Sequence, residues 1–120
     1  MTASPPGELD QVNERNALVM EFLTEVSGDL ERLRAGSEDP DALDSASWRR
    51  IQTTAHNIGA RAEALKLSVM QQCARELEEF ATEVLKPTDS NKSEAIQGAL
   101  IALEIVELEL RALKRDSPRG

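Results

Sequence analysis

The chain is poor in aromatic residues and in residues that bind metals or form disulfides. Its 120 residues include two phenylalanines, one tryptophan, one cysteine and one histidine, and no tyrosine. We expect no β-sandwich or barrel, because such folds use many more aromatic and β-branched residues. The single cysteine, Cys73, cannot form an internal disulfide, which favours a reducing, cytoplasmic setting. One cysteine and one histidine also cannot supply the four ligands of a structural zinc site.

Basic clusters and long apolar runs are equally scarce. The formal charge is −8, and no basic cluster offers the surface that a nucleic-acid partner needs. No run of about 18 apolar residues could form a transmembrane helix. Residues 1–10 lack the basic start and apolar stretch of a secretory signal. We therefore expect one cytoplasmic domain with neither a nucleic-acid nor a membrane partner.

What the chain does contain is four segments with apolar residues at every third or fourth position, the spacing of one helix face. We expect helices over residues 10–34, from a cap at Ser45 or Ser47 to about Lys66, from a Ser68 cap to just before Pro87, and from a cap within residues 88–90 to about Leu113. Their stripes are Val19, Leu23, Val26, Leu30 and Leu33; Trp48, Ile51, Ala55, Ile58, Ala62 and Leu65; Met70, Cys73, Leu77, Phe80 and Val84; and Ala99, Leu103, Val106, Leu110 and Leu113.

Four such helices joined by short links predict an all-α fold, an antiparallel up-down four-helix bundle. The bundle spans residues 10–116, with flexible tails over residues 1–9 and 117–120. Asn13 or Gly28 could divide the first helix and leave a short extra N-terminal helix.

The fourth helix carries a second apolar stripe, formed by Ile101, Ile105 and Leu108. This stripe lies roughly 160° around the helix from the first one. Either the leading segment around residues 12–18 packs on it, or it forms a contact with a second copy or another protein.

His56 is the residue most suited to chemistry. The heptad pattern places Ala55 and Ile58 in the seam and His56 on the solvent side. Gly59 and Ala60, one turn later, are small and leave the imidazole clear. No serine, cysteine or second histidine is placed to form a nucleophile–base pair with it. A neutral, nucleophilic imidazole in this position suits presentation to another protein's active site, although its position alone favours an inert surface histidine.

The residues around His56 resemble the signature of histidine phosphotransfer (HPt) domains. Ala55, His56, Ile58 and Leu65 match that signature, and residues 73–78 resemble the family's helix behind the histidine helix. The resemblance covers about residues 10–114. It implies a phosphoryl carrier on His56, working between receiver domains or from a sensor histidine kinase. The partner would supply the Mg²⁺ and the catalytic carboxylates, so the chain itself would be neither an enzyme nor a cofactor protein.

The chain departs from the family pattern just after the histidine. Gly59 stands where the family usually has a lysine thought to offer positive charge to the phosphoryl group, Ala60 where it has glycine, and Lys66 at a second glycine. Arg49, two turns earlier, could replace the lysine only by folding back, and Arg61 lies about 140° around the helix. We expect a monomer whose partner docks around His56 on Gln52, Thr53, Gly59, Ala60 and Glu63.

Two other functions stay open at this point. The missing lysine fits an HPt-like module that docks to receivers or kinases without carrying phosphate. The stripe of Ile101, Ile105 and Leu108 fits a structural bundle that dimerises.

We interpret two carboxylate clusters as solvated faces rather than a di-metal site, because no glutamate lies three residues before His56. These clusters are Glu76, Glu78 and Glu79, and Glu104, Glu107 and Glu109.

Overall fold

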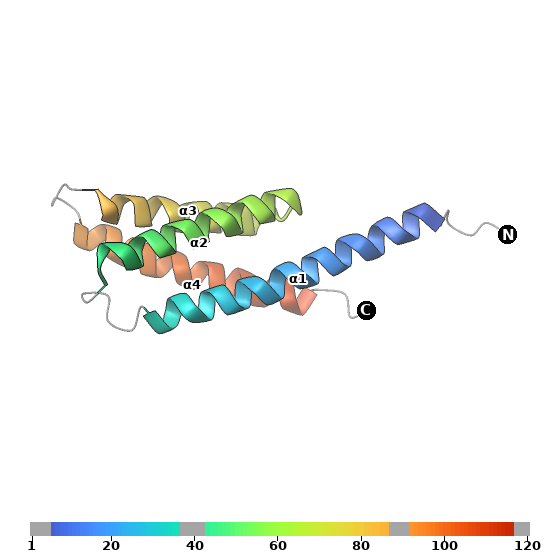
Figure 1. Cartoon of the computed structure of the whole chain (residues 1–120), viewed down its shortest axis with the longest axis horizontal. Coiled ribbons are helices and arrows are strands. Elements are labelled where there is room, and N and C mark those ends of the chain that lie inside the picture. Colours follow the sequence, from blue (N-terminus) through green and yellow to red (C-terminus); the bar gives the residue numbers. More distant parts are fainter. Residues whose placement is uncertain (1–5, 37–42, 87–91, 117–120) are drawn as a thin grey trace.

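The chain forms four α-helices in a computed structural model that describes residues 6–36, 43–86 and 92–116. The helices are α1 (Pro6–Gly36), α2 (Ser45–Ala64), α3 (Ser68–Leu85) and α4 (Lys92–Asp116). Neighbouring helices run in opposite directions along one long axis (Figure 1). The predicted all-α, antiparallel up-down four-helix bundle is confirmed.

The core is built from the apolar stripes of all four helices. The side chains of Phe22, Ile58, Met70 and Leu77 are among its largest fully buried members. Helices α2 and α3 approach each other closely because their facing surfaces carry small residues, whereas α1 contributes larger side chains and packs less closely. Within the described ranges, no helix combines the length and the apolar composition needed to cross a bilayer.

A tight turn joins α2 to α3. The backbone N–H groups of Leu65, Lys66 and Leu67 donate to carbonyl oxygens in the last turn of α2. Lys66 has a φ of 59°, in the left-handed region that terminates helices. Because the turn is this short, it makes α2 and α3 antiparallel neighbours and determines which of their residues face each other.

The helix starts differ in part from the predicted caps. The Asp44 carboxylate accepts a hydrogen bond of 2.9 Å from the Ser47 backbone N–H and caps α2. The predicted caps Ser45 and Ser47 lie inside the helix instead. Ser68 opens α3 but makes no side-chain cap. The predicted cap of α4, within residues 88–90, lies outside the described residues.

Helix α1 is longer than predicted and undivided. It begins at Pro6, whose fixed φ suits the first turn of a helix, so residues 6–9 of the predicted tail are helical. It continues through Asn13 and Gly28, and no separate N-terminal helix forms within the described residues. Residues 1–5 and 117–120 of the predicted tails lie outside the described part of the chain.

The second stripe of α4 is exposed. The side chains of Ile101, Ile105 and Leu108 are all exposed to solvent, and Ile101 is 58% accessible. The prediction that the leading segment covers this stripe is wrong, because α1 is one continuous helix whose leading part does not turn back to cover the stripe. Its N-terminal end extends past the other helices (Figure 1), and Leu18 is itself exposed. The side chain of Val12 lies outside the described residues.

Phe80 also differs from its predicted place in the α3 stripe. Its side chain is partly exposed, and its ring lies over Gly98 of α4, where an added Cβ would be 2.6 Å from Phe80 Cδ1. Gly98 therefore makes room for an aromatic ring at the edge of the core rather than inside it.

Candidate functional site

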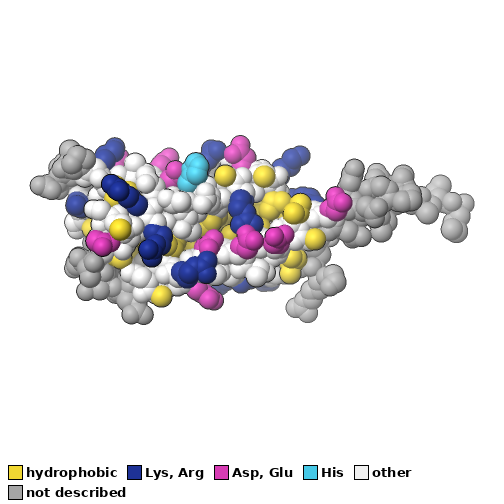
Figure 2. Space-filling view, viewed as in Figure 1, with side chains coloured by type: hydrophobic (Ala, Val, Ile, Leu, Met, Phe, Trp, Pro, Cys, Tyr) yellow, Lys and Arg dark blue, Asp and Glu magenta, His cyan; other side chains and the backbone are white. Residues whose placement is uncertain are grey.

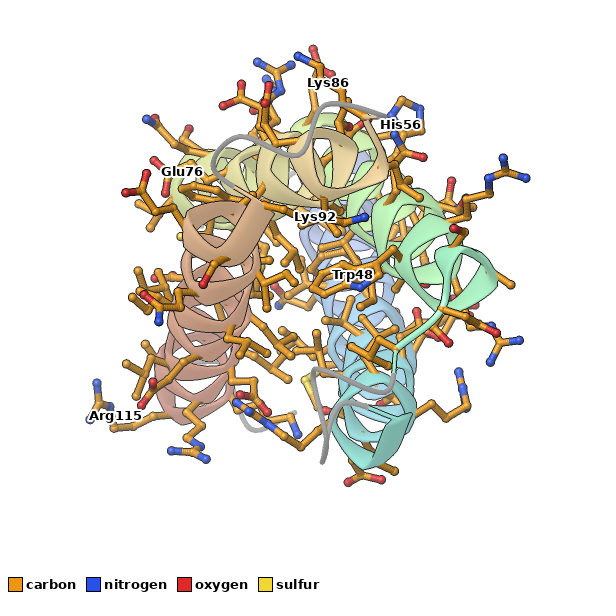
Figure 3. The ribbon with its side chains drawn as sticks, turned by 90° about the vertical axis from the view of Figure 1, so that its left-hand side faces the viewer. Trp48, His56, Glu76, Lys86, Lys92 and Arg115 are labelled. Carbon is orange, nitrogen blue, oxygen red and sulfur yellow. The ribbon has the colours of Figure 1, made fainter. Side chains whose placement is uncertain are left out.

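The His56 imidazole lies on the outer surface of α2, with 66% of its side chain accessible. Ala55, Ile58 and Ala62 are buried, as the heptad pattern predicts, and Leu65 at the end of the helix is half-buried. Trp48, two turns earlier, points into the bundle while His56 points away from it (Figure 3). The imidazole is visible at the molecular surface (Figure 2), so a partner protein can reach it.

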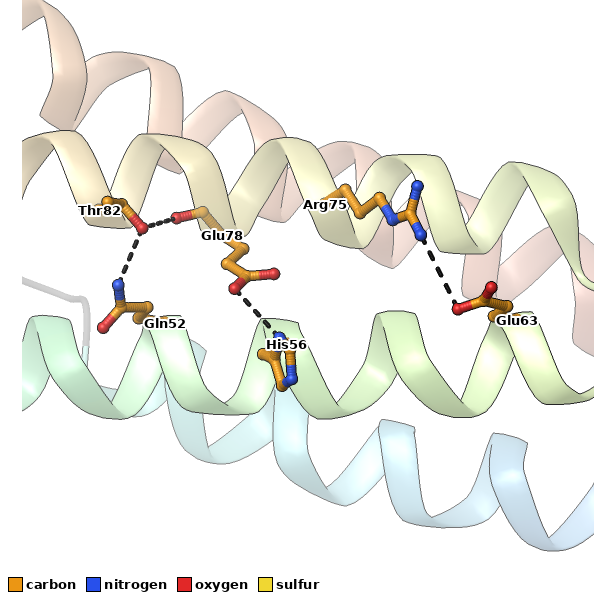
Figure 4. Close-up of polar contacts among 6 residues, drawn as sticks. All are labelled: Gln52, His56, Glu63, Arg75, Glu78 and Thr82. Carbon is orange, nitrogen blue, oxygen red and sulfur yellow. Dashed lines mark hydrogen bonds and ion pairs between the residues drawn. The ribbon is translucent and has the colours of Figure 1, made fainter.

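Among the described residues, the imidazole has one polar partner, which comes from α3. His56 Nδ1 lies 3.1 Å from Glu78 Oε2 (Figure 4). An ionised carboxylate can only accept hydrogen bonds, so Nδ1 must carry the proton in this contact. The neutral ring then keeps its lone pair on Nε2, the nitrogen on the far side of the ring from Glu78. A carboxylate that accepts a hydrogen bond from the ring in this way selects one tautomer and orients the ring.

A second polar contact between α2 and α3 lies one turn before the histidine. Gln52 Nε2 donates to Thr82 Oγ1 over 2.8 Å, and the Thr82 hydroxyl donates to the backbone carbonyl of Glu78 over 2.8 Å (Figure 4). This short chain of hydrogen bonds ties the two helices together beside the site. It therefore holds the Glu78 backbone in register with His56.

The structure divides the predicted docking residues. Thr53, Ala60 and Glu63 are exposed and Gln52 is half-buried. Gly59 is buried against α3, with its added Cβ 3.7 Å from Ala74 Cβ. A helix turns by about 100° per residue, so position 59 lies about 60° from His56 toward α3. The expectation that Gly59 forms part of the open face is wrong, and a tryptophan there would push α2 away from α3.

The cations near the site also come from more than one helix. Arg61 forms an ion pair with Glu25, and its guanidinium lies 5.5 Å from the Phe22 ring centroid, so it faces α1. This agrees with its predicted position away from His56. Arg75 of α3 lies beside the site instead, 3.8 Å from the Glu63 carboxylate, with its Cγ 3.9 Å from the Cβ position of Gly59.

Two functional candidates, Glu78 and Arg75, were not singled out as site residues from the sequence. Glu78 was assigned to a solvated carboxylate face, and Arg75 had no assigned role. The available signal was the short link between the two helices, which predicts the antiparallel pairing of residues near 56 with residues near 78. Among the described residues, no three histidine, cysteine, aspartate or glutamate side chains converge to hold a metal ion.

Cys73 has no part in this site. Its thiol is buried in the core, and burial raises the pKa of Cys73, with the nearby carboxylates of Glu109 and Glu76 acting in the same direction. A thiol with a raised pKa is a poor nucleophile at neutral pH.

Comparison with protein-family models, curated proteins and solved structures finds no match to the chain.

Proposed function

We propose that this protein is an HPt-like phosphoryl carrier in a two-component phosphorelay, with His56 as the phosphoryl acceptor. The observation that supports the proposal most directly is the pairing of His56 Nδ1 with Glu78 on an exposed helix face. This pairing leaves Nε2 as the free nucleophile. The resemblance of residues 55–65 to the HPt signature points to the same nitrogen-bound phosphoryl chemistry.

The transfer step follows from this geometry. The Nε2 lone pair attacks the phosphorus of an aspartyl phosphate on a receiver domain, in line with the bond to the aspartyl oxygen. The new P–N bond forms as the P–O bond breaks, and the aspartate leaves as a carboxylate. Both ring nitrogens are then substituted, so the imidazole is cationic, and Glu78 stabilises the charge on Nδ1–H. The reverse step passes the phosphoryl group to a second receiver.

The partner completes the site in this proposal. By the HPt resemblance, the receiver domain supplies Mg²⁺ and the catalytic carboxylates, and a sensor histidine kinase could be the first donor. The exposed residues Thr53, Ala60 and Glu63 would form the docking surface around the imidazole, with Gln52 at its edge. The carrier would act as a monomer in the cytoplasm.

Phosphorylation by candidate partners tests the proposal. The wild-type protein and His56→Gln are incubated with phosphorylated receivers and autophosphorylated kinases from the same genome. We expect acid-labile, alkali-stable phosphate on the wild type and none on His56→Gln. Asn57→Ala, a change at an exposed neighbour, serves as the control and should keep the label. An acid-stable label, or equal labelling of His56→Gln, would contradict the assignment.

A second candidate is a docking module that never carries phosphate. Glu63 and Glu78 both lie on the same side as the imidazole, and Gly59 provides no cation. Such a module would bind a receiver with equal affinity as wild type and as His56→Gln, and neither would be labelled.

The exposed stripe of Ile101, Ile105 and Leu108 favours a third candidate, a bundle that dimerises. Sedimentation of the wild type and of Ile105→Glu tests it. A dimer that dissociates on substitution would support this structural role, and a monomer in both cases would remove it.

A further inference from the structure

The antiparallel register of α2 and α3 brings Arg75 of α3 beside α2 one turn past His56. Gln52 meets Thr82, His56 meets Glu78, and the Gly59 position meets Arg75. Each step forward along α2 is matched by an equal step back along α3. Residues three apart on a helix are surface neighbours. Arg75 lies three residues before Glu78, so the two side chains share the face of α3 that borders α2.

Gly59 and Arg75 have complementary shapes. The stem of Arg75 lies over Gly59, with its Cγ 3.9 Å from the place where a Cβ at position 59 would be. Gly59 thus provides the room that the stem occupies. The Arg75 side chain is 59% exposed, and among the described residues its guanidinium has one charged partner, Glu63, at 3.8 Å. A contact this long between exposed groups is weak, so the guanidinium can move to a stronger anion.

A phosphoryl group on His56 would be such an anion. It carries close to two negative charges near neutral pH, and it would form on Nε2, at a surface that already carries the carboxylates of Glu78 and Glu63. The shallow depression next to the site is lined by Arg75, Glu78, Glu79, Phe80, Thr82 and Glu83. Arg75 is the only basic side chain among the described residues of that lining, so it is the residue placed to offset the negative charge.

We infer that Arg75 of α3 is the phosphoryl-binding cation of this site. When His56 is phosphorylated, the Arg75 guanidinium leaves the Glu63 carboxylate and binds the phosphoryl group. The inference rests on the proposed function in that it requires His56 to accept a phosphoryl group. It assigns to the neighbouring helix a charge that α2 itself does not supply. A planar guanidinium can bind two phosphoryl oxygens at once.

Phosphoramidate tests this inference without any partner protein. It is a small anionic donor whose nitrogen is already protonated: Nε2 attacks the phosphorus, the P–N bond breaks, and the nitrogen leaves as ammonia while Nδ1 of His56 keeps its proton. The rate of labelling of the full chain is followed by intact mass at low and high salt. We expect Arg75→Ala to be labelled about two- to fivefold more slowly at low salt, with the difference shrinking at high salt because exposed charges are screened.

Two further variants separate charge from structure. Arg32→Ala removes an equally charged, exposed arginine that pairs with Asp29 within α1, and its rate should equal that of the wild type. Gly59→Lys in the Arg75→Ala background places an ammonium in the space that the Arg75 stem has vacated, and it should restore most of the rate. A purely structural role for Arg75 predicts neither the rescue nor the salt dependence.

The outcomes distinguish the two proposals. An unchanged rate in Arg75→Ala, or an equal loss in Arg32→Ala, would overturn the role of Arg75 while leaving His56 as the acceptor. Normal Arg75 dependence with phosphoramidate, but no labelling by any receiver or kinase, would overturn the relay function and keep the anion site. If phosphoramidate labels free histidine but not the wild-type protein, both proposals fail.

Discussion

Removing the Glu78 carboxylate should change which nitrogen of His56 carries the proton. A hydrogen bond to a charged group contributes roughly 1.5–3 kcal/mol when it is shielded from water. Here the His56 and Glu78 side chains are 66% and 31% accessible, so we reduce the figure to about 1 kcal/mol. That free energy corresponds to about a fivefold change in the ratio of the two neutral tautomers. Glu78→Ala should therefore shift the ring about fivefold toward the Nε2–H form.

The single histidine makes this shift directly measurable. Long-range ¹H–¹⁵N NMR spectra of the labelled protein at about pH 8 give one set of imidazole signals, from which the ratio of the two neutral tautomers is read. Glu79→Ala is the matched control, because it removes the same charge from the next residue of α3, which is exposed. The reasoning is refuted if the tautomer ratio is unchanged in Glu78→Ala or changes equally in Glu79→Ala.

The tautomer shift has a chemical consequence. Nε2–H has no lone pair with which to attack phosphorus, so Glu78→Ala should be labelled by phosphoramidate more slowly, in proportion to the lost Nδ1–H tautomer. Glu78→Gln should retain part of the rate, because an amide oxygen can still accept from Nδ1.

Three further predictions concern the fold. In a Phe80→Ala background, Gly98→Ala should stabilise the protein by about 1 kcal/mol, because alanine has the higher helix propensity. In the wild type the gain should be clearly smaller, because the added Cβ meets the Phe80 ring. Equal gains in the two backgrounds, measured by urea denaturation, would contradict this. Cys73 should react with a thiol reagent far more slowly than a free cysteine, because burial raises the pKa of its thiol, and the rate should rise only when urea unfolds the chain. The hydrogen bond from the Ser47 backbone lowers the pKa of Asp44 below its ordinary value of 3.8. The ionised Asp44 carboxylate therefore stabilises the fold above pH 3.8, and this stabilisation is lost as the pH falls through the lowered pKa. The stability difference between the wild type and Asp44→Asn, measured by urea denaturation across the acid range, should therefore change as the pH drops, and a constant difference would refute it.

The sequence predicted the fold well because helix periodicity is a local property. Residues such as Val26, Ile58 and Leu77 must share a buried face once their segments are helical, whatever the neighbours are. The exposure of His56 followed from the same pattern. Phe80 shows the limit of the method, because its position in the stripe depends on a missing side chain at Gly98, in another helix.

The site itself was only half predictable, for a reason of the same kind. A heptad pattern separates buried from exposed positions, but it does not say which exposed flank borders a neighbouring helix. Gly59 was therefore placed on the open face, although it lies toward α3. Glu78 and Arg75 enter the site only through the register between two helices. That register depends on the geometry of the turn at Lys66, which periodicity does not describe.

The tight turn between α2 and α3 also bears on how the chain folds. It closes with very little loss of loop entropy, so contacts between these two helices can form before those that need longer links. An early nucleus in this hairpin would give high φ-values at Ala62 and Ala74, both buried in its closely packed interior, and low ones in α1. His56 and Glu78 belong to the same hairpin. The site would then be assembled while half of the bundle is still unfolded.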